Sequence, residues 1–207
     1  GQRVLPAARW RAADIATLDS PTRWAPLLEG VDCVVNASGA LQDGLRDDVA
    51  AVQDIAIRTL IAACEQSNVK RFVQISAPGV SADATTGFLR TKAAADAALA
   101  ESALDWVIFR PGLVWGRTAT GGTALVRMLA AFPIVQPIML ADARVQTVDI
   151  DDVSRAVADA VDGALPKGSD IDLVEVAPLT LGEIVARVRA WHGFPPPRAT
   201  LAAPPLL

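Results

Sequence analysis

Residues 31–39 read VDCVVNASG, an apolar run that ends in a short loop of small and polar residues. Such a run, bounded by turn residues, is typical of a buried strand. The next apolar run, Phe72–Ser76, also ends in a small polar loop. Between the two runs, Asp47–Gln66 has apolar residues at helical spacing. The stretch therefore predicts a strand, a helix and a second strand, with the strands paired in parallel.

The same alternation extends in both directions. Upstream, Trp10–Ile15 is expected to be a short strand, followed by a helix that ends at Gly30. Downstream, an apolar loop interrupted by proline is expected from Phe132 to Leu140. The other expected elements are a helix at Thr91–Ser102, a strand at Trp106–Phe109, a helix at Thr123–Ala131, a helix capped by Asp151 or Asp152, a strand at Ile171–Val176, and a helix that begins with the capping box Thr180–Glu183 and ends at Gly193. This order predicts an α/β, Rossmann-like doubly wound parallel sheet, with a ligand crevice at the carboxyl ends of its strands.

Composition and charge exclude several classes of protein. Hydrophobic residues make up 52% of the 207 residues, which argues against a disordered chain. The net charge of −4, with scattered basic residues, gives no reason to expect a nucleic-acid partner. Cys33 and Cys64 do not form a disulfide framework, and no signal peptide is visible. A cytoplasmic location is expected, with the inner face of a membrane left open.

The strand ends, in this order, resemble the short-chain dehydrogenase/reductase (SDR) superfamily over roughly Trp10–Gly193. The resemblance places Ser76 at the position of the catalytic serine and Phe88–Lys92 on the Tyr-x-x-x-Lys signature. Lys92 is then expected to bind a ribose hydroxyl as well. The other residues that the resemblance assigns to the cofactor are Asp14, Ile15, Asn36, Ala37, Ser38, Gly39, Pro111, Gly112, Leu113 and Val114.

Residues taken singly have simpler interpretations. Lys92 can be a solvated helix lysine, Ser76 a turn residue and Asp14 a cap of the following turn. Asp149, Asp151 and Asp152 are expected to cap a helix rather than bind a metal. His192 is the only histidine, which argues against a histidine-based zinc site. No metal site is therefore expected.

The group that the chain resembles most is that of the atypical and extended SDR proteins. It includes NAD(P)H-binding proteins of the NAD-dependent epimerase/dehydratase type and the SDR-like accessory subunit of respiratory complex I. The implied partner is a dinucleotide, NAD or NADP, with NADPH slightly favoured. A peripheral membrane or respiratory-complex partner and the oligomeric state are left open.

Two departures from the family pattern affect the expected function. Phe88 stands where the family has its catalytic tyrosine, and the chain contains no tyrosine. A phenyl ring has no ionisable group, so it cannot exchange a proton with a substrate oxygen. The glycine-rich loop that holds the pyrophosphate is also not found.

The missing loop leads us to expect that the chain begins late. It would start either in the second strand, at Gln2–Ala8, or just before the third, which we favour, so that the first βα unit is absent. Residues 1–194 are expected to form a partial Rossmann-like domain, and residues 195–207 a Pro-rich tail or linker. Such a fragment would expose an apolar sheet edge, bind dinucleotide weakly or not at all, and tend to aggregate.

Three functions follow from these observations. The first is an NAD(P)(H)-binding protein that lacks tyrosine-dependent SDR catalysis and has a sensing, assembly or structural role. The second is an active NAD(P)-dependent oxidoreductase or epimerase with another proton donor, such as Ser76. The third is a membrane-complex interaction protein that binds no nucleotide.

Overall fold

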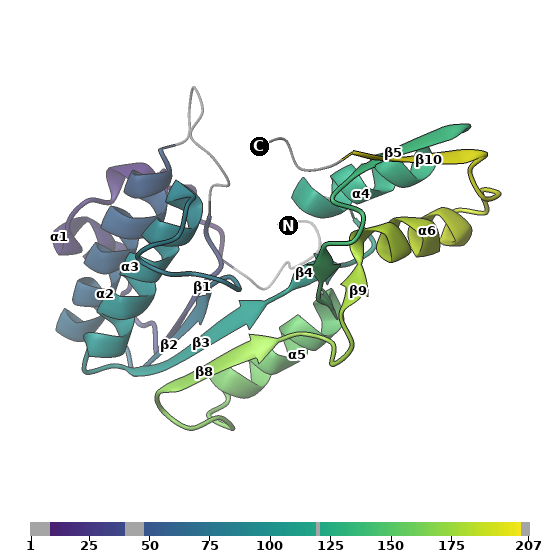
Figure 1. The fold of residues 1–207 in the computed structure, drawn as a ribbon. Helices are drawn as coiled ribbons and strands as arrows, with labels where there is room; N and C mark the ends of the chain where they lie inside the picture. The colour runs from purple at the N-terminus through teal and green to yellow at the C-terminus, as the bar shows by residue number, and fades with distance from the viewer. Residues whose placement is uncertain (1–8, 40–47, 119–120, 204–207) are drawn as a thin grey trace. The chain divides into compact units, whose positions relative to one another are not determined.

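The structure is a computed structural model that describes residues 9–39, 48–118 and 121–203 (Figure 1). The chain divides into two compact units. The first contains residues 1–74 and 79–106, and the second contains residues 75–78 and 107–207.

The first unit is built on a pair of parallel strands. β1 (Cys33–Asn36) pairs with β2 (Arg71–Ile75), with Asn36 opposite Gln74 at the end of β1. Figure 1 shows α1, α2 and α3 together on one side of these strands. The helical elements are η1 (Ile15–Thr17), α1 (Pro21–Trp24), η2 (Ala25–Leu27), η3 (Ala51–Ile55), α2 (Ala56–Gln66) and α3 (Gly87–Glu101).

The expected strand–helix–strand segment is thus confirmed as β1, η3 with α2, and β2. The expected start of this helix at Asp47 lies outside the described residues, as does the Gln2–Ala8 strand. The helix contains one turn of π-helix, η3, before it becomes regular at Ala56. Its apolar face is buried through Val49, Ala56, Leu60 and Ala63.

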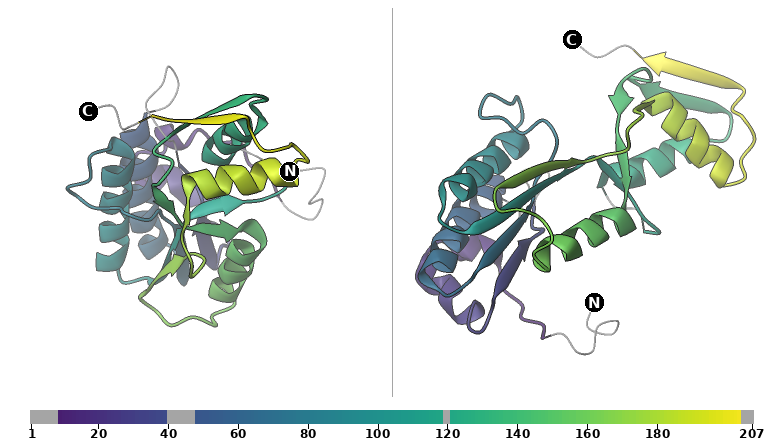
Figure 2. Two further views of the ribbon diagram at one scale, coloured as in Figure 1. Left: turned by 45° about the vertical axis from the view of Figure 1, so that its right-hand side comes forward. Right: turned by 90° about the horizontal axis from the view of Figure 1, so that it is seen from below.

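The second unit contains another pair of parallel strands, β3 (Asp105–Pro111) and β8 (Ser169–Leu173). Its other strands form three short pairs, β4 with β7, β6 with β9 and β5 with β10. α4 and α6 pack against each other (Figure 2). With β5 they form a hydrophobic core of Val126, Ala130, Ile138, Ile184 and Val185. The remaining elements are β4 (Leu113–Trp115), α4 (Gly121–Ala131), β5 (Val135–Met139), β6 (Arg144–Val145), β7 (Thr147–Asp149), α5 (Ile150–Val161), β9 (Leu179–Thr180), α6 (Leu181–Trp191) and β10 (Ala199–Ala203).

Several local predictions are corrected by the structure. Trp10–Ile15 is not a strand, because Asp14 caps the short turn η1 and accepts a hydrogen bond from the Ala16 amide. α5 is capped by Asp149 rather than by Asp151 or Asp152, which lie in its first turn. α3 begins four residues earlier than expected, at Gly87, because the Thr86 hydroxyl caps it.

The Pro-interrupted segment was expected to be a loop, but residues 135–139 form β5. Gln136 and Ile138 are buried while Pro137 and Met139 are exposed, which is the alternation of a half-buried strand. Part of the Pro-rich tail is also ordered, since β10 pairs in parallel with β5. The two-stranded sheet tolerates Pro137 because β5 has no second partner strand among the described residues.

Candidate functional site

A polar cluster closes the end of β1 in the first unit. The buried Asn36 donates a hydrogen bond from Nδ2 to Oε1 of Gln74, at 2.8 Å. Its Oδ1 accepts hydrogen bonds from the amide and the hydroxyl of Ser38, at 3.1 and 2.6 Å. The Asn36 side chain therefore fixes the turn Asn36–Gly39 and connects it to β2.

Lys92 and Gly39 lie next to each other in this unit. A Cβ atom placed on Gly39 would lie 3.8 Å from Nζ of Lys92 and 3.5 Å from Oε1 of Gln53. Lys92 and Gln53 are both buried, at 6% and 2% exposure. The structure thus brings together a backbone without a side chain, an ammonium group and an amide, contributed by the β1 loop, α3 and η3.

Burial lowers the pKa of Lys92, and the nearby Asp96 carboxylate opposes this effect in part. The ammonium also lies 5.8 Å from the centroid of the Phe88 ring, one turn earlier on α3. Lys92 is therefore not a solvated surface lysine, which was the simpler interpretation of its position. Phe88 stands beside it, at the position that the resemblance to the SDR superfamily assigns to the catalytic tyrosine.

The Asp14–Ile15 pair is in the same unit, on the turn η1. Asp14 caps that turn, as its simpler interpretation predicted. The carbonyl of Leu18 after the turn accepts hydrogen bonds from Thr59 on α2 and from the indole of Trp24, both at 2.9 Å. These contacts fix the turn against the helices of the unit.

The other predicted site residues are in the second unit. Ser76 is buried at 5% exposure, and its amide donates a 2.7 Å hydrogen bond to the carbonyl of Phe109 on β3. Pro111 is buried at the end of β3, and Leu113 and Val114 begin β4, which pairs with β7. Arg110 forms a two-pronged ion pair with Asp170 on β8, which indicates a structural role for this side chain.

Gly112 is required by a close backbone approach. A Cβ atom at this position would lie 2.4 Å from the carbonyl oxygen of Gln146. The amides of Gly112 and Leu113 donate hydrogen bonds to the carbonyls of Leu173 and Gln146, at 3.0 and 2.9 Å. The Pro111–Val114 segment is therefore held between β7 and β8.

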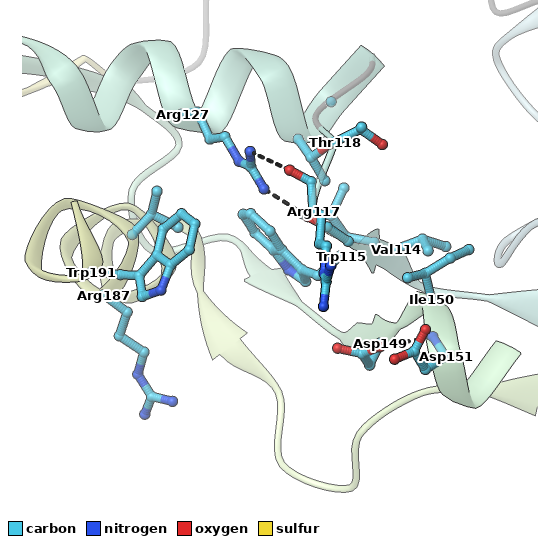
Figure 3. Close-up of a pocket in the computed structure, with 15 residues that line it drawn as sticks. Val114, Trp115, Arg117, Thr118, Arg127, Asp149, Ile150, Asp151, Arg187 and Trp191 are labelled. Atoms are coloured by element: carbon cyan, nitrogen blue, oxygen red, sulfur yellow. Dashed lines mark hydrogen bonds between the residues drawn. The ribbon is translucent and has the colours of Figure 1, made fainter. Parts of the chain in front are cut away.

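The sequence motifs did not predict the roles of Gln53 and Gln74 or the cavity in the second unit. Gln53 and Gln74 had no motif to mark them, although a polar residue within an apolar helix face or strand is a usable signal. The cavity has a volume of about 1060 Å³ and is lined by Leu113, Val114, Trp115, Gly116, Arg117, Thr118, Gly122, Thr123, Arg127, Asp149, Ile150, Asp151, Arg187, Val188 and Trp191 (Figure 3).

With this geometry established, comparison with known proteins identifies the class. A model of the NAD(P)H-binding family matches residues 5–163, and the chain belongs to that family. Curated protein sequences give no significant match.

Solved structures of nucleotide-sugar enzymes share the fold. UDP-glucuronic acid 4-epimerase from Bacillus cereus, in complex with NAD, aligns with a TM-score of 0.78 at 16% identity, over 97% of this chain and 72% of that one. The Bordetella bronchiseptica enzyme WbmH, in complex with NAD+, gives 0.75 at 20% identity over 93% and 68%. UDP-glucose 4-epimerase from Thermus thermophilus, in complex with NAD, gives 0.70 at 19% identity over 93% and 71%.

The expected α/β fold with a Rossmann-type parallel sheet is thereby confirmed, as is membership of an NAD(P)H-binding family, and the epimerase structures share this fold. The structure also offers residues that fit part of a dinucleotide. Gly39 has no side chain where Gln53 and Lys92 approach it, and the buried ammonium of Lys92 lies there as a hydrogen-bond donor. Asn36 and Ser38 shape the loop that carries Gly39.

Proposed function

We propose that this protein binds NAD(P)(H) without tyrosine-dependent SDR turnover and acts as a sensing, assembly or structural component. The observation that carries the proposal is the cluster of Lys92, Gly39 and Gln53 beside Phe88. Keeping a buried lysine charged costs free energy, and a ligand hydroxyl that accepts its hydrogen bond would offset that cost. The cofactor is NAD or NADP.

The residues of this chain have distinct roles in the proposal. Lys92 and the Asn36–Gly39 turn hold the ribose-bearing part of the cofactor, with Asp14 and Ile15 toward its adenine side. Pro111, Gly112, Leu113 and Val114 lie along the nicotinamide side. Phe88 contributes only a nonpolar ring, so no phenolic proton donor stands beside Lys92.

A titration of NADPH and NADH into the full-length protein tests the proposal. Binding is followed by tryptophan fluorescence, and turnover is assayed with common carbonyl and nucleotide-sugar substrates. We expect saturable binding of at least one cofactor and no turnover. Rapid turnover of any of these substrates would refute the non-catalytic role, and the absence of saturable binding would refute the binding role.

Ser76 supports a second candidate, an active NAD(P)-dependent oxidoreductase or epimerase with another proton donor. Its hydroxyl-bearing side chain is buried directly after β2. The resemblance to the SDR superfamily assigns it to the position of the catalytic serine. If an activity is found, Ser76→Ala should abolish it while cofactor binding remains. An activity that survives Ser76→Ala would remove the role proposed for Ser76.

Exposed apolar side chains support a third candidate, a partner at a membrane or a respiratory complex. On α4, Leu125 and Met128 are 57% and 64% exposed, and Ile134 follows at 55%. No helix in the described part of the chain is long and apolar enough to cross a membrane. This candidate predicts that the protein sediments with membranes in the absence of nucleotide, and a double Leu125→Ser, Met128→Ser variant should not.

A further inference from the structure

The cavity of the second unit has walls from five elements, of which β7 contributes Asp149. β4 contributes Leu113–Trp115, α4 contributes residues near its start, α5 contributes Ile150 and Asp151, and α6 contributes residues of its last two turns. Its volume of about 1060 Å³ is large enough for a small-molecule ligand. Figure 3 shows the labelled side chains around it.

Two indole rings stand in these walls. Trp115 comes from β4 and Trp191 from the last residue of α6 (Figure 3). Trp191 is 71% exposed, so most of its surface is not packed against the protein. Exposed indole faces beside a cavity favour a flat ring, because aromatic surfaces stack on one another.

Arginines give the cavity a positive character. Arg117 and Arg187 line it, and neither forms an ion pair within the described chain. Arg127 is held by hydrogen bonds to the carbonyls of Gly116 and Arg117, at 2.7 and 3.2 Å. Its guanidinium carbon lies 5.5 Å from the centroid of the Trp191 ring.

The Nε atom of Arg127 is a buried donor without a hydrogen-bond partner among the residues that the structure describes. A buried unsatisfied donor costs free energy, more so when it is charged. Because this atom has almost no accessible surface, a ligand in the cavity does not reach it. Arg127 contributes to the wall through its positive charge.

The acidic side chains in the wall do not cancel this character. Asp149 caps α5 and accepts a 2.7 Å hydrogen bond from the Asp151 amide. The positive end of the α5 dipole offsets both carboxylates. Arg117 and Arg127 form no ion pair with a carboxylate among the described residues, whereas Arg187 interacts electrostatically with Glu183, one turn earlier on α6.

We propose that this cavity binds a flat aromatic ligand that carries an anionic group. The ring lies against Trp115 and Trp191, and the anion lies toward Arg117, Arg127 and Arg187. Leu113 and Val114 belong both to this wall and to the segment assigned to the nicotinamide side. The position of the ligand next to the cofactor therefore rests on the proposed function, whereas its binding to the cavity does not.

Three probes separate the contributions of ring and charge, in the absence of dinucleotide. They are 2-naphthoate, the neutral 2-naphthylmethanol and the non-aromatic cyclohexanecarboxylate. Binding is followed in the full chain by the indole N–H signals in two-dimensional NMR spectra. The five tryptophans give five such signals, which single Trp→Phe variants assign. We expect 2-naphthoate to shift the signals of Trp115 and Trp191, and to bind at least about tenfold more tightly than either other probe.

Matched variants localise the effect. Trp191→Ala and Arg187→Ala remove exposed side chains of the wall and should weaken 2-naphthoate binding about tenfold. Trp10→Ala and Arg155→Ala remove exposed side chains elsewhere and should leave it unchanged.

Two results would overturn the proposal. The first is that 2-naphthoate leaves the Trp115 and Trp191 signals in place. The second is that 2-naphthylmethanol binds as tightly as 2-naphthoate. Because no cofactor is present, either result would leave the proposed dinucleotide binding untouched.

Discussion

At the scale of single residues, two glycines matter for opposite reasons. Gly39 has room for a Cβ atom, which would lie 3.5 Å from Oε1 of Gln53 and 3.8 Å from Nζ of Lys92. Gly112 leaves no space at all, because the Gln146 carbonyl occupies the place of its missing side chain. The sequence motifs predicted both positions for cofactor binding, but only the structure shows that Gly112 alone is required by packing.

Gly112→Ala should destabilise the protein by about 1–3 kcal/mol, since the added methyl group forces the backbone of Gln146 to move. The free energy of unfolding is measured by urea denaturation. Gly87→Ala is the matched control, because a Cβ atom there meets only the end of the Arg90 side chain, at 4.0 Å. Equal stability of the two variants would contradict the role given to Gly112.

Cys64 should be unreactive in the folded protein. Burial, with smaller contributions from Cys33 and Glu65, raises the pKa of its thiol to about 12, so very little thiolate exists at pH 8. Burial also raises the pKa of Cys33. A disulfide exchange reagent at pH 8 should label both thiols slowly in the folded protein and rapidly after unfolding in guanidinium. Fast labelling of Cys64 without unfolding would show that α2 is less tightly packed than described.

At the scale of elements, α6 was the helix best predicted by its end signals. Thr180 and Glu183 form the expected capping box, with the Thr180 amide donating to Glu183 at 2.7 Å and the Glu183 amide donating to Thr180 at 3.1 Å. The strands β5 and β10 were not predicted from the sequence. Prolines beside an apolar run favour a loop when no partner strand is known. The π-helical turn η3 was missed as well, since its apolar spacing differs little from that of an α-helix.

The capping box should make stability depend on pH. Hydrogen bonds from Thr180 lower the pKa of the exposed Glu183 below its ordinary value of 4.5. Its folded pKa is thus below its unfolded pKa. The contribution of the Glu183 carboxylate to the stability of the folded protein is therefore complete above the unfolded pKa. It is lost as the pH falls through the folded pKa.

Thermal unfolding of the protein and of Glu183→Gln measures this effect. The difference in melting temperature should be largest near neutral pH and should shrink as the pH approaches 3. A difference that stays constant between pH 7 and pH 3 would show that the Glu183 charge has no part in the cap. Thr180→Ala should cost about 1 kcal/mol at neutral pH.

At the scale of the whole molecule, the predicted site residues are divided between the two units. Asp14, Asn36, Gly39 and Lys92 are in the first, and Ser76 and the Pro111–Val114 segment are in the second. The fold class could be predicted because strands and helices alternate along the whole chain. The place of Gln53 next to Gly39 could not be predicted, because only folding brings the two residues together. The cavity beside Trp115 could not be predicted for the same reason.

The central claim is that Lys92 holds a dinucleotide, and one measurement tests it most directly. NADPH and NADH are titrated into the full-length protein, its Lys92→Met variant and its Lys70→Met variant. Lys70 is an exposed lysine that pairs with Asp32 on the surface, so it serves as the control. We expect Lys92→Met to weaken binding at least about tenfold and Lys70→Met to leave it unchanged. Equal affinity of the Lys92→Met variant and the unmodified protein would contradict the claim.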